Sequence, residues 1–164
     1  MRLPLLFLAG LLTSCSKTPV AAPRAAPQGA SIVEPFSSTV SLFERLAKEG
    51  ETRDKADPST SKVIEALTAA GLALADQRQQ SAANLGASFC VTINSTEHVT
   101  LSICEFRDPQ SAKVGAETSR KALQQIAGRT VEVKRSTTLA VIDSQADAAS
   151  GLVAQKARAA FNAL

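Results

Sequence analysis

The fold of this chain is decided by residues 89–106, FCVTINSTEHVTLSICEF. Apolar residues alternate there with small or polar residues in two runs separated by a short break. A period of two is typical of antiparallel strands that bury one face, so the stretch predicts a β-hairpin. The apolar set is Phe89, Val91, Ile93, Val99, Leu101 and Ile103, and the polar set is Cys90, Thr92, Asn94, Thr100, Ser102 and Cys104.

The register of this hairpin follows from the same alternation. The two apolar sets share a face only if the loop has an odd number of residues, because a slip of one residue turns every side chain over. A turn centred on Glu97 satisfies this condition and places Cys90 directly opposite Cys104. Opposed residues in an antiparallel pair have Cα atoms about 4.5–5.5 Å apart, which suits a disulfide. The sequence therefore predicts a structural Cys90–Cys104 disulfide on the face away from the core.

Helices and further strands are predicted on both sides of this hairpin. Two Asp-Pro pairs are typical helix starts, with the carboxylate as N-cap and proline in the first turn. Strands joined mainly by hairpins favour an antiparallel sheet, and amphipathic helices then cover one of its faces. The prediction is an α+β two-layer sandwich over residues 57–164, with two hairpins and one further strand. Its elements are helices from Asp57-Pro58, from Asp108-Pro109 and from a capping box of Ser144 with Asp147, a strand at 72–79, and a second hairpin of 130–135 and 138–143.

The second hairpin defines a candidate interaction surface. Val131 and Val133 are expected to share the buried face with Leu139 and Val141. The other face of the sheet is then open and polar. Such a face is usually plain solvated surface, and it can also dock a protein or an envelope polymer. The predicted interaction face consists of Thr92, Asn94, Thr100, Ser102, Glu132, Lys134 and Thr138.

The first fourteen residues indicate export. Arg2 precedes an apolar run that is too short to cross a bilayer, which is typical of a secretory signal peptide. The four residues Leu12-Thr13-Ser14-Cys15 resemble the lipobox of bacterial lipoproteins. The resemblance implies cleavage before Cys15, a diacylglyceryl group on its sulfur and an acyl chain such as palmitate on its new amine. Ser16, where an aspartate would act as a retention signal, implies sorting to the outer membrane.

Residues 15–56 are predicted to link this anchor to the domain. Their first half is rich in Pro, Ala and Ser, a composition that favours extended conformers over a packed core. A short amphipathic helix that contains Phe43 and Leu46 is expected near the end of the segment. The folded domain would then face the periplasm or the cell surface.

The residues offer little for catalysis or for nucleic-acid binding. The net charge is only +3, and the chain has no Trp and no Tyr for stacking bases, so nucleic acid is not expected as a partner. The single histidine, His98, lies at the predicted hairpin tip, and no phosphate-binding, dinucleotide-binding or metalloprotease motif is present. No catalytic residue, cofactor or metal site is therefore predicted.

Three functional hypotheses remain. The first is a non-enzymatic, lipid-anchored envelope lipoprotein that acts as an interaction or assembly module, with a membrane anchor and an envelope protein or polymer as partners. The second is a carrier or sensor of a small ligand. The third is a thiol redox protein that uses Cys90 and Cys104, although the two cysteines do not form a Cys-x-x-Cys motif.

Overall fold

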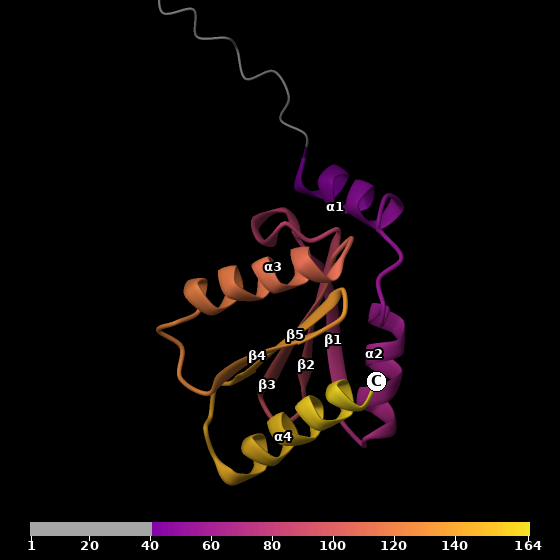
Figure 1. Cartoon of the computed structure of the whole chain (residues 1–164). Helices are drawn as coiled ribbons and strands as arrows, with labels where there is room; N and C mark the ends of the chain where they lie inside the picture. Colours follow the sequence, from indigo (N-terminus) through magenta and orange to yellow (C-terminus); the bar gives the residue numbers. More distant parts are fainter. Residues whose placement is uncertain (1–40) are drawn as a thin grey trace, which may run out of the picture. The chain divides into compact units, whose positions relative to one another are not determined.

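The computed structural model describes residues 41–164. The predicted signal peptide, Cys15 and most of the predicted linker lie outside these residues. The described chain folds around a five-stranded antiparallel sheet with the strand order β1-β2-β3-β5-β4 (Figure 1). This arrangement confirms the predicted α+β class, built from two hairpins and one further strand. The strands are β1 (Leu74–Gln80), β2 (Phe89–Ser95), β3 (Val99–Glu105), β4 (Arg129–Lys134) and β5 (Thr137–Asp143).

Helices pack on both faces of this sheet. Helices α2 and α4 lie together on one face, whereas α3 crosses the other, as Figure 1 shows. The first face carries the helical layer that the sequence predicts, and α3 adds a partial layer on the second. The helices are α1 (Leu42–Glu51), α2 (Thr60–Ala69), the short 3-10 helix η1 (Ala83–Leu85), α3 (Pro109–Ala122) and α4 (Ala148–Ala163).

The larger core lies between the first face and helices α2 and α4. Burying these apolar side chains supplies most of the driving force for folding, at about 25 cal/mol per Å². The buried residues of this cluster include Val91, Ile93, Val99, Leu101, Ile103, Leu139 and Val141 from the sheet and Val63, Leu67, Ala157 and Phe161 from the helices. The predicted apolar face of the first hairpin is therefore confirmed.

The register of the first hairpin is also confirmed. Cys90 pairs with Cys104 across β2 and β3, and a disulfide joins them with a Cα–Cα distance of 4.2 Å. The loop closes without glycine because Ser95 Oγ accepts hydrogen bonds from the backbone N–H groups of Glu97 and Val99 (3.2 Å each). Both cysteines lie on the second face, as predicted, but they are buried there. A second, smaller apolar cluster that includes Phe106 and Ala112 covers them.

The predicted facing of the second hairpin is wrong. Only two residues, Arg135 and Ser136, connect β4 and β5, so residues of opposite parity share a face. Val131 pairs with Ala140, on the face opposite to Leu139 and Val141. The valine is nevertheless buried, because α3 covers it with Ala116. Alternation of apolar and polar residues indicates the period of this strand but not which of two buried faces the valines occupy.

Two of the three predicted helix starts differ in the structure. Helix α2 is capped by Ser59, whose Oγ accepts a hydrogen bond from the backbone N–H of Lys62, and Asp57 lies two residues before this cap. Helix α4 begins with a capping box of Asp147 and Ser150, so Ser144 is not its cap. Each of these two helices begins at the capping residue nearest to its first buried residue, because packing of the buried face determines which residues form the first turn. Helix α3 starts as predicted, with Asp108 as N-cap and Pro109 in the first turn.

The Asp108 cap predicts a pH-dependent contribution to stability. The backbone N–H and the hydroxyl of Ser111 donate to the Asp108 carboxylate (2.7 and 3.0 Å) and, with Arg107, hold the pKa of Asp108 below its usual 3.8. A carboxyl group whose pKa is lowered by folding stabilises the protein above its unfolded-state pKa, and this stabilisation is lost as the pH falls through the lowered value. Asp108→Ala should therefore lower the melting temperature at neutral pH and have a shrinking effect below pH ~4. Melting curves of the wild type and of Asp108→Ala across this pH range test the prediction. Asp108→Asn is the control, because asparagine still caps the helix but does not titrate. A difference in melting temperature between Asp108→Ala and the wild type that did not change with pH would contradict the prediction.

The folded part includes residues before position 57. Gln79 Nε2 donates to the carbonyl oxygen of Leu46 (2.7 Å), and the backbone N–H of Ala82 donates to Glu49 (3.1 Å). Arg53 forms an ion pair with Glu105 at the end of β3 (2.9 Å). Helix α1 and the segment after it are thus tied to the sheet, and α1, which contains Phe43 and Leu46 as predicted, extends to Glu51.

Candidate functional site

A groove lies between the second face of the sheet and the C-terminal half of α3. Its volume is about 290 Å³, near the lower end of the range for small-ligand sites. The groove, called the α3 groove below, is open to solvent on one side. It is lined by Gln80, Leu85, Thr92, Thr100, Ser102, Ser119, Ala122, Leu123, Ala140 and Ile142.

The position of α3 explains why a groove forms at this end. Gly115 lies against the ring of Phe106, where a Cβ atom would stand 2.3 Å from ring carbons, so glycine allows the helix to approach closely. Ala112 and Ala116 keep the same half of α3 tightly packed on the sheet. The residues of α3 that line the groove come one to two turns later, after this close contact.

Polar side chains of β1, β2 and β3 form the floor of the groove. Gln80 donates through Nε2 to Ser102 Oγ (2.5 Å) and accepts from the Thr92 hydroxyl through Oε1 (2.7 Å). Thr100 donates its hydroxyl proton to Asn94 Oδ1 (3.0 Å). Each hydroxyl both donates and accepts, so the Ser102 proton and lone pairs of Thr92 and Thr100 remain available to a ligand.

The walls of the groove are mainly apolar. Leu85 of η1 and Leu123 at the end of α3 are half-buried, and Ala122 is exposed at the rim. Ala140 and Ile142 of β5 continue the apolar surface beneath α3. The site therefore combines an apolar wall with neutral hydrogen-bonding groups, an arrangement that suits binding and orientation of an amphiphilic molecule.

The structure brings part of the predicted interaction face together at this groove. Thr92, Thr100 and Ser102 form its floor, and Asn94 is hydrogen-bonded to Thr100 beside it. Thr138 is on the same face but is buried next to Cys104. Glu132 and Lys134 lie on the opposite face, because they pair with Leu139 and Thr137. Lys134 Nζ donates there to the carbonyl oxygen of Asn162 in α4.

Sequence reasoning missed the residues that turn a flat polar face into a groove. They are Gln80, Leu85, Ser119, Ala122 and Leu123, which come from β1, η1 and α3. The sequence contains a second set of small and apolar residues, which are the alanines of α3 and the valines of β4. These residues indicate that a helix also covers the second face.

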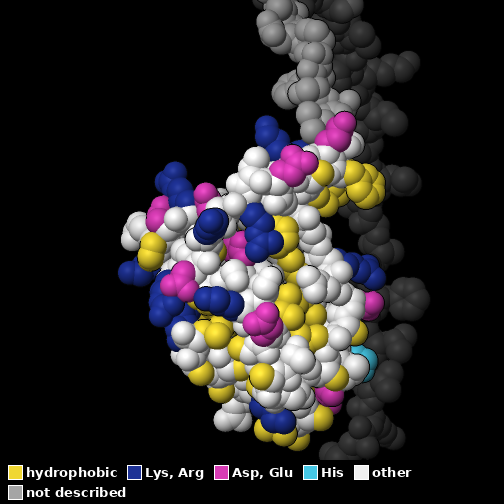
Figure 2. Space-filling model, turned by 90° about the vertical axis from the view of Figure 1, so that its right-hand side faces the viewer, with side chains coloured by type: hydrophobic (Ala, Val, Ile, Leu, Met, Phe, Trp, Pro, Cys, Tyr) yellow, Lys and Arg dark blue, Asp and Glu magenta, His cyan; other side chains and the backbone are white. Residues whose placement is uncertain are grey.

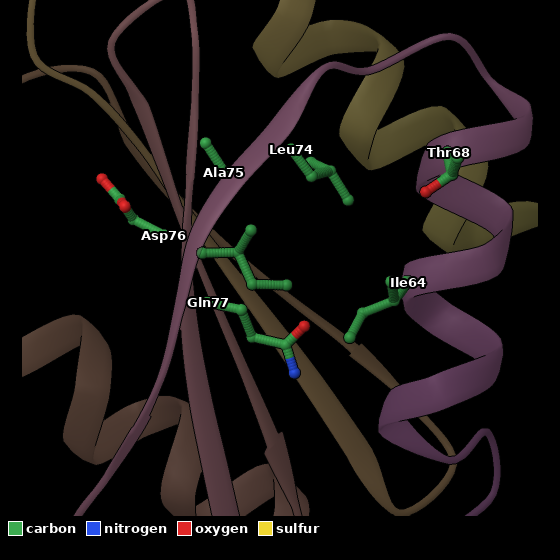
Figure 3. Close-up of a pocket in the computed structure, with 7 residues that line it drawn as sticks. Ile64, Thr68, Leu74, Ala75, Asp76 and Gln77 are labelled. Carbon is green, nitrogen blue, oxygen red and sulfur yellow. The ribbon is translucent and has the colours of Figure 1, made fainter.

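A second hollow lies at the edge of the sheet, between β1 and α2. Its volume is also about 290 Å³, and Ile64, Thr68 and Leu74 are among its walls. Strand β1 is irregular between Ala75 and Arg78, and Figure 3 shows Gln77 extending toward α2 while Asp76 points away from it. This hollow is open at an edge strand and lacks the paired hydroxyl groups of the α3 groove.

Glu105 is the most deeply buried charged residue that the structure describes. Its side chain is fully buried, and Oε1 accepts hydrogen bonds from Arg53 Nη2 (2.9 Å) and from the backbone N–H of Thr60 (2.5 Å). The guanidinium of Arg53 also stacks over the Phe89 ring at 4.4 Å from its centroid. The ion pair of Arg53 with Glu105 links the segment before α2 to the sheet, so Glu105 has a structural role.

Residues 41–164 contain no cluster of three or more His, Cys, Asp or Glu side chains that could hold a metal ion. Among the helices of the same region, none combines the length and apolar character needed to span a bilayer. Comparison of the chain with protein-family models, curated proteins and solved structures finds no match.

Proposed function

We propose that this chain is a lipid-anchored envelope protein that binds a small amphiphilic ligand in the α3 groove and does not catalyse a reaction. The observation that carries the proposal is the pairing of a hydroxyl-lined floor with an apolar wall in one groove. Apolar surface provides affinity, and a few fixed polar groups orient the ligand. Gln80 holds Thr92 and Ser102 in place, so these groups are arranged before a ligand arrives.

The proposed anchor is Cys15, in the outer membrane, with the domain facing the periplasm or the cell surface. Several acyl chains, at ~0.8 kcal/mol per buried methylene, would hold the protein stably on the bilayer. Metabolic labelling of the producing bacterium with an alkyne fatty acid should tag the wild-type protein, and Cys15→Ala should abolish the label. Cys90→Ala and Cys104→Ala together should leave the label intact. A labelled Cys15→Ala protein would contradict the anchor.

Ligand binding in the groove is tested by placing a large side chain at its rim. Ala122 is exposed at the groove rim, so Ala122→Phe should obstruct the groove without disturbing the core. We expect the amphiphilic dye anilinonaphthalene sulfonate to bind the wild-type domain saturably, and the variant to bind at least tenfold more weakly. Ala159→Phe makes the same change at an exposed position of α4, in the opposite layer, and should bind the dye like the wild type. Equal dye binding by all three proteins would overturn the groove as the binding site.

A second candidate function is docking of another envelope component, and a specific surface favours it. Helix α1 has no buried residue, and its Leu42 and Phe43 are 51% and 82% exposed. Figure 2 shows hydrophobic side chains on the surface of α1, at the top of the coloured part of the molecule. Replacing both residues with serine separates the two functions: it should remove a crosslinked partner in cells if α1 docks one, and it should leave dye binding in the α3 groove unchanged.

A further inference from the structure

A polar hollow adjoins the α3 groove at the tip of the first hairpin. Its volume is about 330 Å³, and Thr100 lines both this hollow and the α3 groove. The two spaces therefore meet at Thr100, on the second face of the sheet. The hollow is called the tip hollow below, and its lining includes Asp76, Asn94, Thr96, His98, Thr100 and Ser144.

A bulge in β1 places a carboxylate at the tip hollow. Strand β1 is irregular between Ala75 and Arg78, and Asp76 adopts a φ of 47° there, in the left-handed region that residues other than glycine seldom occupy. Asp76 borders both the hollow beside β1 and the tip hollow, and Figure 3 shows its side chain pointing away from α2. Bulges commonly redirect a side chain beside a functional site. The carboxylate of Asp76 is thus on the side of the tip hollow.

The other polar side chains of the tip hollow offer both donors and acceptors. Asn94 accepts from the Thr100 hydroxyl through Oδ1 (3.0 Å), so its Nδ2 group remains a donor. Ser144 donates to the carbonyl oxygen of His98 (3.0 Å), so lone pairs of its Oγ atom remain acceptors. The second of these bonds also ties the hairpin tip to the segment after β5. The amide of Asn94 therefore complements the carboxylate of Asp76, which only accepts.

The charges of the tip hollow favour an uncharged head group. No Lys or Arg lines it in the described part of the chain, so an anionic head would face Asp76 without a countercharge. A cationic head would pair with Asp76, but this residue is exposed, and an exposed ion pair contributes little. A hydroxyl group both donates and accepts. A head group with several hydroxyls can therefore bond to the carboxylate of Asp76 and to the amide of Asn94 at once.

We infer that the tip hollow binds the uncharged, polyhydroxylated head group of an amphiphile whose apolar chain lies in the α3 groove. This inference rests on the proposed function, because it names the ligand class of the same groove. Sugars and glycerol share the chemistry that the tip hollow recognises. A glycolipid would supply the first, and a monoacylglycerol the second.

Isothermal titration calorimetry with ligands of one chain length tests the inference. The parent protein carries Cys15→Ala, so that no acyl chain of its own competes for the groove. At least one of octyl glucoside and 1-O-octylglycerol, each below its micelle-forming concentration, should bind at least tenfold more tightly than octanol does. Methyl glucoside has the sugar without the chain and should bind at least tenfold more weakly than octyl glucoside. The tighter of the two octyl ligands identifies the source of the natural head group.

Three variants assign the contacts. Asp76→Gly removes the carboxylate and suits the φ of 47°, so it should lose the preference over octanol and still bind octanol like the parent protein. Glu65→Gln removes a carboxylate from an exposed position of α2, in the opposite layer, and should bind every ligand like the parent protein. Ala122→Phe should weaken octyl glucoside binding at least tenfold, because it obstructs the groove for the chain.

Three results would overturn the inference. If octanol bound as tightly as both polyhydroxylated ligands, the groove would bind alkyl chains without a head-group site. If octylammonium bound more tightly than both, Asp76 would form a site for cations. If Asp76→Gly kept the full preference over octanol, the head group would bind elsewhere. The proposed function would survive each result as long as the dye still required an open groove, and equal dye binding by Ala122→Phe and the parent protein would refute the proposed function itself.

Discussion

Replacing Arg53 with methionine is expected to lower the free energy of unfolding by about 3 kcal/mol, the lower end of the range for breaking a buried ion pair. Glu105 is fully buried, whereas the Arg53 side chain is 34% exposed, so the variant leaves the buried carboxylate without its countercharge. The contact of Arg53 with the Phe89 ring is lost as well. Urea unfolding at neutral pH measures the change.

Two controls separate this buried pair from ordinary surface charge. The double variant Arg53→Met/Glu105→Gln has no unpaired carboxylate at position 105, so a large part of the lost free energy of unfolding should be recovered. Asp57→Asn breaks the ion pair between Asp57 and Arg135, whose side chains are both more than half exposed, and should cost less than ~1 kcal/mol. If Arg53→Met cost no more than Asp57→Asn, Glu105 would not depend on Arg53 for its burial.

Replacing Cys90 and Cys104 together with alanine is expected to cost at least about 3 kcal/mol of stability, the chain-entropy value for a loop of about 15 residues. The two cysteines are 14 residues apart, and their side chains are 0% and 2% exposed. Truncating them also leaves space in the apolar cluster around Phe106 and Ala112, which adds to the cost. Urea unfolding of the variant and of the oxidised wild type gives the difference.

Burial of this disulfide also tests the thiol redox hypothesis. A soluble reductant can reach the sulfur atoms only when α3 and its neighbours open, because both cysteines lie beneath them. In native buffer the disulfide should therefore persist in dithiothreitol, and it should be reduced quickly in urea. Rapid reduction of the folded protein, without loss of structure, would contradict a purely structural disulfide.

The first hairpin could be predicted in full because its two requirements agree. The alternation of apolar and polar residues requires an odd number of residues in the loop. The pairing of Cys90 with Cys104 then selects one register among those allowed. The second hairpin contains no such pair. Its two-residue loop reverses the facing of Val131 and Val133, and the period of two in the sequence is the same in either case.

The candidate site could be predicted only in part for a related reason. Thr92, Thr100 and Ser102 follow from the register of one hairpin, which the sequence specifies. The wall over them depends on which face α3 covers, and this involves packing between segments far apart in the chain, such as Ala116 of α3 with Val131 and Ala140.

Binding of a small amphiphilic ligand in the α3 groove is tested by an amide-resolved NMR titration of the folded domain with decanoate, which has an alkyl chain and a polar head. We expect saturable chemical-shift changes centred on Thr92, Thr100, Ser102 and Ser119, and loss of these changes in Ala122→Phe. The hollow beside β1 should remain unperturbed. Changes centred instead on Ile64, Thr68 and Gln77, or no saturable change in any amide, would contradict ligand binding in the α3 groove.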